Sequence, residues 1–254
     1  MKKIALIIAA LAVAGVSYAA DSATVTTKPS YSVTSDFSYT SEYVFRGIQS
    51  SYAATQGSVE VGQDDFRVGI WTNQPTNSAT TGATNEIDFY AGYKLKLDRD
   101  LTADFVATYY YYPENNGGAT RNSYELGVGG TYDLVGLNPG FAGISTSLYY
   151  YYDFRLRAQT LQVSVGYSLA LKDFGTSLDF SVFAGQVAAK KLFPDSGFKI
   201  RESYGYYGIG LNIPYKLAEN AQVHIGTSYT FNTNVPVGTV RNNLAVNGGI
   251  TLGF

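Results

Sequence analysis

The chain has 254 residues, a formal net charge of −2, no cysteine, one histidine, 23 tyrosines and 27 glycines. A mildly acidic chain without a basic block is a poor partner for nucleic acid, and the lack of cysteine excludes disulfides and thiolate metal sites. The many tyrosines and glycines favour β structure.

The first residues have the pattern of a targeting segment. Lys2 and Lys3 precede an apolar run over residues 4–16, and Ser17-Tyr18-Ala19 supplies a small-x-small cleavage site. The run is shorter than the ~20 residues that a membrane-spanning helix needs. We therefore predict a signal peptide over residues 1–19 and a flexible periplasmic leader over residues 20–30. An exported chain without disulfides must be held by a large core or a closed sheet.

From Tyr31 onward, apolar and polar residues alternate with few interruptions, which is the pattern of strands with one apolar face. The first predicted strand runs from Tyr31 to Arg46, with Tyr43 and Phe45 on its apolar face and Glu42 and Arg46 on its polar face. The other predicted strands pass through Val59–Val61, Phe66–Ile70, Glu86–Leu95, Leu101–Tyr112, Ser123–Tyr132, Ile144–Asp153, Leu161–Leu171, Ser177–Val187, Glu202–Ile213, Ala221–Phe231 and Arg241–Phe254. Twelve strands are an even number, as single-chain bacterial barrels require.

The predicted connections are alternately short and long, as expected for periplasmic turns and outer loops. Short connections are predicted at Asp98–Asp100, Lys172–Gly175 and Tyr215–Asn220, and longer ones at Asn73–Asn85, Pro113–Arg121 and Lys190–Arg201. Two connections do not follow this alternation, namely the long turn Leu134–Phe141 and the short loop Phe154–Ala158.

The last strand gives the strongest indication of a membrane protein. Leu244, Val246, Ile250, Leu252 and Phe254 share one face, and small or polar residues occupy the other. A soluble β-sandwich could show the same alternation but would rarely end on the aromatic residue. Ile250, Leu252 and Phe254 resemble the insertion signal read by the barrel-assembly machinery. We therefore predict an all-β fold, a closed antiparallel transmembrane β-barrel of about 12 strands over residues 31–254, surrounded by lipid in the bacterial outer membrane.

One stretch carries a resemblance to a known family. Ser41-Glu42-Tyr43-Val44-Phe45-Arg46-Gly47-Ile48 resembles the signature of TorF-type porins, and the similarity extends through residues 56–60, 69–73 and 86–93. Glu42 stands where the family favours Asp, and Gln49-Ser50 where it favours Ser-Gln. The resemblance implies an outer-membrane barrel regarded as a porin by analogy, without known functional residues that could be carried over.

Little in the sequence indicates an enzyme or a metal site. The sole histidine, His224, lies on the polar face of its strand, and Gly226 stands where barrel lipases carry the serine of a His-x-Ser arrangement. We therefore interpret His224 as a hydrogen-bonded residue of the interior, and we expect no cofactor and no metal.

The inward-facing residues are the candidates for controlling passage through the lumen. The parity of the strands points ten acidic residues inward (Asp36, Glu42, Glu60, Glu86, Asp88, Asp104, Glu125, Asp153, Asp179, Glu202) and five basic ones (Arg46, Arg67, Lys94, Lys96, Arg241). Tyr110, Tyr112, Tyr149, Tyr151, Tyr204 and Tyr206 also point inward. Arg46 fits either an ion pair that fixes its strand or a charge at the constriction.

The surplus of acidic residues favours cations. Twelve strands lie between eight, where side chains fill the barrel, and sixteen, where an aqueous channel remains. The main hypothesis is a passive channel for small hydrophilic solutes that prefers cations. The alternative is a non-conducting barrel that acts through its outer loops as an adhesin or a structural element.

Overall fold

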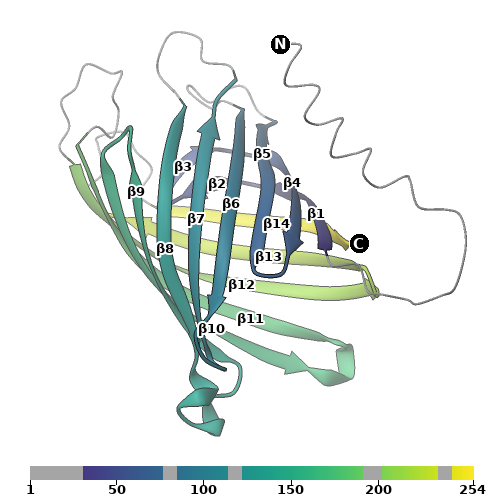
Figure 1. Ribbon diagram of the computed structural model, residues 1–254. Helices are drawn as coiled ribbons and strands as arrows, with labels where there is room; N and C mark the ends of the chain where they lie inside the picture. Colours follow the sequence, from purple (N-terminus) through teal and green to yellow (C-terminus); the bar gives the residue numbers. More distant parts are fainter. Residues whose placement is uncertain (1–30, 77–84, 114–121, 191–201, 234–241) are drawn as a thin grey trace, which may run out of the picture. The chain divides into compact units, whose positions relative to one another are not determined.

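The computed structural model describes residues 31–76, 85–113, 122–190, 202–233 and 242–254. The predicted signal peptide and leader lie outside these residues. Along the described chain, twelve strands form the wall of a barrel (Figure 1). They are β1 (Tyr31–Thr40), β4 (Ala54–Gln63), β5 (Phe66–Pro75), β6 (Glu86–Lys96), β7 (Leu101–Tyr111), β8 (Ser123–Asp133), β9 (Ile144–Asp153), β10 (Ala158–Leu171), β11 (Thr176–Ala189), β12 (Glu202–Ala218), β13 (Ala221–Asn232) and β14 (Asn242–Gly253).

The sheet closes on itself through β1, which pairs antiparallel with both β4 and β14. Ser35, for example, lies opposite Val59 on one side and Leu252 on the other. The C-terminal residue continues this seam, because Val33 and Phe254 exchange two backbone hydrogen bonds of 3.0 and 2.8 Å. Closure leaves no strand edge unpaired, which is what a sheet in lipid requires. The predicted closed antiparallel barrel of twelve strands is confirmed.

The two faces of the wall have opposite chemistry. Large apolar side chains on the outer face are open, including Ile209 (59% exposed) and Val182 (58%), whereas the interior buries carboxylates such as Glu125 (5%) and Asp104 (7%). A protein folded in water shows the reverse arrangement. The apolar outer face and polar interior are those of a barrel that spans a membrane.

The short connections gather at one end of the barrel, here called the turn end, and the opposite end, with the β1–β4 and β9–β10 connections, is called the loop end. At the turn end, Asp64 takes a left-handed backbone conformation (φ 52°) in the two-residue turn between β4 and β5. Three short 3₁₀ helices also lie there: η1 (Leu134–Gly136), η2 (Pro139–Phe141) and η3 (Lys172–Phe174). None of the helices in the described ranges is long and apolar enough to cross a membrane.

Two predicted strand boundaries are wrong. The first strand ends at Thr40, and the chain then forms a separate two-stranded hairpin from β2 (Tyr43–Phe45) and β3 (Ile48–Ser51). β12 does not end at Ile213 but continues to Ala218, so that most of the predicted turn Tyr215–Asn220 is strand. Pro214 lies within β12 and has no N–H to donate, and the pairing of β12 with β11 is interrupted beside it.

Candidate functional site

The β2–β3 hairpin reverses direction over two residues, Arg46 and Gly47. Both have positive φ angles, 48° and 79°, between the paired residues Phe45 and Ile48. Two central residues with positive φ define a type I′ turn, which matches the twist of a tight hairpin, and glycine is favoured in it. The turn places Arg46 at the tip of the hairpin. Residues 41–48, which carry the family resemblance, thus build the hairpin rather than the upper part of β1.

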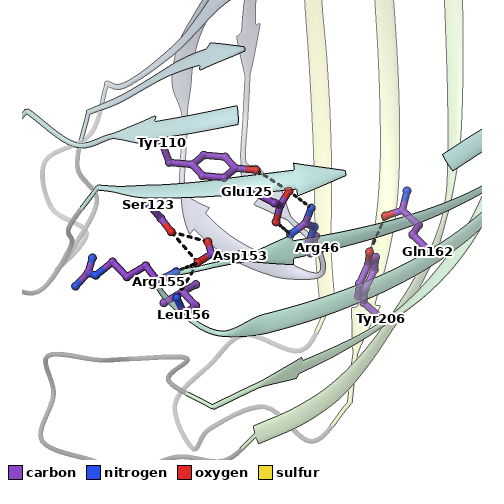
Figure 2. A network of polar contacts seen from close by, with 9 residues as sticks. All are labelled: Arg46, Tyr110, Ser123, Glu125, Asp153, Arg155, Leu156, Gln162 and Tyr206. Carbon is purple, nitrogen blue, oxygen red and sulfur yellow. Dashed lines mark hydrogen bonds and ion pairs between the residues drawn. The ribbon is translucent and has the colours of Figure 1, made fainter. Parts of the chain in front are cut away.

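Arg46 forms an ion pair with Glu125 on the inner face of β8 (Figure 2). Its two terminal nitrogens donate to the two carboxylate oxygens at 2.6 and 2.7 Å, and the Tyr110 hydroxyl donates to the same carboxylate at 3.2 Å. The guanidinium also lies 4.5 Å from the ring centre of Tyr151 and 4.7 Å from that of Phe45. Burial acts to lower the pKa of Arg46, but the hydrogen bonds and charge of Glu125 raise it overall. The prediction that Arg46 lies beside Glu42 on the first strand is wrong.

The opposite side of the hairpin tip contacts β12 and β13. The Asn232 side chain donates a hydrogen bond to the Gly47 carbonyl. Gly47 packs so closely on Tyr206 that a side chain at this position would overlap the Tyr206 Cβ atom. Tyr206 in turn donates to Gln162 at 2.6 Å, as Figure 2 shows. The hairpin tip therefore reaches β8 on one side of the lumen and β13 on the other.

The Arg46–Glu125 pair forms one charged layer of the wall. A second charged layer lies nearer the turn end. Arg67 donates to both oxygens of Asp104 at 2.9 and 3.0 Å, and its Nε atom lies 3.9 Å from Glu60. Tyr149 donates to Asp104 at 3.1 Å, and Tyr90 donates to Glu60 at 3.0 Å. Each carboxylate in this layer therefore has a positive neighbour and a tyrosine hydroxyl.

Several large inward side chains lie against glycines of the adjacent strand. Gly127 and Gly129 on β8 stand opposite Tyr151 and Tyr149 on β9, and any side chain at either glycine would overlap the facing ring. The same relation holds for the pairs Gly69–Tyr90, Gly92–Arg67, Gly185–Tyr206 and Gly208–Phe183. The glycines leave room for these side chains beside the wall, where Tyr206 is buried (2% exposed) in a cluster with Val187 and Tyr204.

Two cavities flank the hairpin tip and share Arg46 and Gln162. The larger, of about 450 Å³, is lined by residues of the charged wall, among them Asp104, Glu125 and Tyr151. The smaller, of about 210 Å³, lies on the side of Phe183, Tyr206 and Thr230.

Other predicted lumen residues lie where parity places them but differ in their surroundings. Glu86 and Asp88 face inward and are buried, at 6% and 9% exposure, and Glu86 accepts a hydrogen bond from Tyr112 at 2.9 Å. Tyr43 of the hairpin lies close to both carboxylates. Lys94 is exposed near the turn end and forms no ion pair with any residue that the structure describes. Neither acid is therefore paired with Lys94 or Arg46.

Asp153 and His224 contact neighbouring residues of the barrel and do not line the cavities beside the hairpin tip. Asp153 accepts hydrogen bonds from Ser123, at 2.7 and 2.8 Å, and from the backbone of Arg155 and Leu156, which fixes the β9–β10 loop. His224 lies with its Nδ1 atom 3.7 Å from Asp36. Within the described ranges, no group of three or more His, Cys, Asp or Glu residues is placed to hold a metal ion.

Sequence reasoning missed the contacts of Gly47, Asn232 and Gln162 with the hairpin tip and its surroundings. It also placed Tyr43 and Phe45 on the lipid face, whereas both belong to the hairpin inside the barrel. The Arg-Gly dipeptide between Phe45 and Ile48 was the available signal, since a glycine at the second central position is typical of a two-residue hairpin.

Solved structures with a similar fold include outer-membrane channels and porins. An outer membrane channel from Pseudomonas putida F1 has 10% identity and a TM-score of 0.56, over 93% of this chain and 100% of that one. The NanC porin has 12% identity and a TM-score of 0.55, over 87% and 98% of the two chains. The KdgM porin has 13% identity and a TM-score of 0.54, over 87% and 99%. At these identities the likeness shows the fold, that of an outer-membrane barrel.

The sequence itself matches a protein family over more than half of its length. No curated protein matches the chain. Residues 24–190 match the family described as "Bacterial protein of unknown function (Gcw_chp)", a range that includes the hairpin and both charged layers of the wall. The chain therefore belongs to the Gcw_chp family.

Proposed function

We propose that this protein is a narrow passive channel of the outer membrane for small hydrophilic solutes, with a preference for cations. The observation that carries the proposal is the way the inward side chains lie against wall glycines, as Tyr149 and Tyr151 do on Gly129 and Gly127. A barrel that served only as a rigid support could fill its interior, as small barrels do. The similarity of the fold to channels and the resemblance of residues 41–48 to TorF-type porins support the same proposal.

The preference for cations rests on the balance of inward charges. Glu202 and Arg241 have side chains outside the described part, and Glu42 lies beyond the end of β1, which leaves eight acidic and four basic inward residues. Carboxylates around a low-dielectric passage raise the local concentration of cations. The KdgM porin has been solved in complex with oligogalacturonate, an acidic oligosaccharide. The acidic lumen of the present barrel favours solutes of the opposite charge.

A second function is favoured by one observation, the hairpin that crosses the lumen. If the hairpin closes the passage, the barrel would be a non-conducting scaffold that acts through its outer loops. The residues on either side of the hairpin tip support the channel instead, because both cavities beside the tip are lined by polar groups such as Gln162 and Thr230.

Planar-bilayer recordings of the purified, folded barrel distinguish these functions. We expect discrete conductance steps and, under a KCl gradient, a reversal potential with the sign of a cation-preferring channel. The double variant Glu86→Gln with Asp88→Asn should reduce that preference only slightly, because both carboxylates are buried against the hairpin. The absence of conductance steps would support the scaffold, and a reversal potential of the opposite sign would contradict the preference for cations.

A further inference from the structure

The Arg46–Glu125 pair lies where the hairpin tip meets the wall of the lumen. Arg46 lines both cavities beside the hairpin tip, and Glu125 lines the larger one. The side chains of the pair are only 13% and 5% exposed, so that little water screens them. We infer that Arg46 limits the cation preference of the channel by neutralising Glu125 beside the passage. The inference rests on the proposed function and names the residues that control it.

Most of the other acidic residues near the loop end are less able to act on a passing ion. Asp153 is held by Ser123 and by two backbone N–H groups. Glu86 and Asp88 lie beside Tyr43 of the hairpin, and neither lines the two cavities beside the hairpin tip. The surplus of acidic residues on the wall therefore gives the general preference for cations, and Arg46 keeps the Glu125 carboxylate from adding to it.

The positive charge of Arg46 balances the negative charge of Glu125. The loss of either partner therefore leaves a net charge beside the passage. Removing Arg46 leaves the Glu125 carboxylate beside the passage without its counter-charge, and removing Glu125 leaves the guanidinium. A unit charge within about 10 Å of an ion in a medium of intermediate dielectric changes its occupancy by roughly three- to tenfold after partial screening. The two changes have opposite signs, because one exposes a negative charge and the other a positive charge.

The hairpin has further attachments, so its position does not depend on the ion pair alone. At its base, Ser41 donates to the Val246 carbonyl at 2.8 Å and accepts from the Val246 N–H at 2.9 Å. At its tip, Asn232 donates to Gly47. Neutral variants of the pair should therefore keep the hairpin inside the lumen and report on charge.

The experiment measures the potassium-to-chloride permeability ratio from reversal potentials for Arg46→Gln, Glu125→Gln and the double variant. We expect a ratio roughly three- to tenfold higher for Arg46→Gln and lower by a similar factor for Glu125→Gln. The double variant should return to within about twofold of the unmodified protein, because its local charge is again balanced. Arg99→Gln, at an exposed arginine (78%) of the turn end, is the matched control and should leave the ratio unchanged.

A merely structural role predicts a different pattern. If the pair only held the hairpin in place, both single variants would change conductance in the same direction, and the double variant would resemble them. Arg46→Lys separates the two roles further, because lysine keeps the charge but not the two parallel hydrogen bonds. We expect its permeability ratio to stay close to that of the unmodified protein. A ratio for Arg46→Lys equal to that of Arg46→Gln, or single variants that shift together, would overturn the inference, whereas a silent unmodified protein would refute the proposed channel instead.

Discussion

Gly127→Ala tests whether the tyrosines of β9 line an open passage. A Cβ atom at Gly127 would lie 2.6 Å from Cδ1 and 2.7 Å from Cε1 of Tyr151, and 2.7 Å from Cγ1 of Val106. Carbon atoms pack at about 3.5–4.0 Å. The Tyr151 ring must therefore move by about 1 Å to admit a single methyl group.

The wall determines the direction of this movement. Gly127 is part of β8, so the ring is displaced away from β8 and into the lumen, where the Arg46 guanidinium lies 4.5 Å from its centre. Arg46 must then shift as well, which narrows the larger cavity. Adding a methyl group to a closely packed site typically costs about 1–3 kcal/mol. We therefore expect a smaller single-channel conductance together with a free energy of unfolding lowered by about 1–3 kcal/mol.

Single-channel recording and denaturant unfolding in lipid vesicles measure the two effects. Gly253→Ala is the matched control, because a Cβ atom at Gly253 meets no atom within 4 Å. It should leave both quantities unchanged. A folded Gly127→Ala barrel with the conductance of the unmodified protein would show that Tyr151 does not border the path of the ions.

Two other predictions concern the outer face and the hairpin. Ile209→Arg, at an outward residue of β12 that is 59% exposed, should destabilise the barrel in vesicles by about 2–4 kcal/mol, as expected for arginine near the bilayer midplane. Leu252→Arg, near the turn end of β14, should cost less, and a cost for Ile209→Arg no larger than that for Leu252→Arg would contradict the lipid contact. Tyr43→Ala should shift the emission of Trp71, the only tryptophan, to longer wavelength, because the Tyr43 ring lies 5.3 Å from the Trp71 ring. An unchanged spectrum would indicate that the hairpin does not cover Trp71.

The wall of the barrel could be predicted from the sequence, and the hairpin could not. Alternation with period two determines which side chains face lipid, and it correctly divided the run Tyr109–Tyr112 between the two faces: Tyr109 and Tyr111 are exposed outside, and Tyr110 and Tyr112 hydrogen-bond carboxylates inside. The same alternation continues past Thr40 to Arg46, although the chain leaves the sheet there. The alternation shows which side chains share a face of a strand, but it does not show which strand pairs with it.

The candidate site was predictable only in part for the same reason. Parity correctly turned Glu125 and Asp104 inward, but it carries no information on partners that are distant in the sequence. Glu125 is 79 residues from Arg46, and Asp104 is 37 residues from Arg67. The path of residues 41–53 decides which acidic residues the hairpin covers and which border the cavities. That path depends on packing against β12, β13 and β14, which are distant in the sequence.

The distribution of charge around the wall explains where the hairpin tip lies. The buried carboxylates of the described residues all belong to β6–β9, whereas the buried side chains of β10–β14 are uncharged. A guanidinium taken out of water is costly unless a carboxylate meets it. Arg46 enters the lumen from the connection between β1 and β4, and at the hairpin tip it meets the carboxylate of Glu125 on β8. The carboxylates of Glu86 and Asp88 on β6 lie beside Tyr43 of the same hairpin. The uncharged wall offers amides, and Asn232 accordingly binds the hairpin through the Gly47 carbonyl. Arg46 thus lies on the side of the lumen where the wall carries its buried carboxylates.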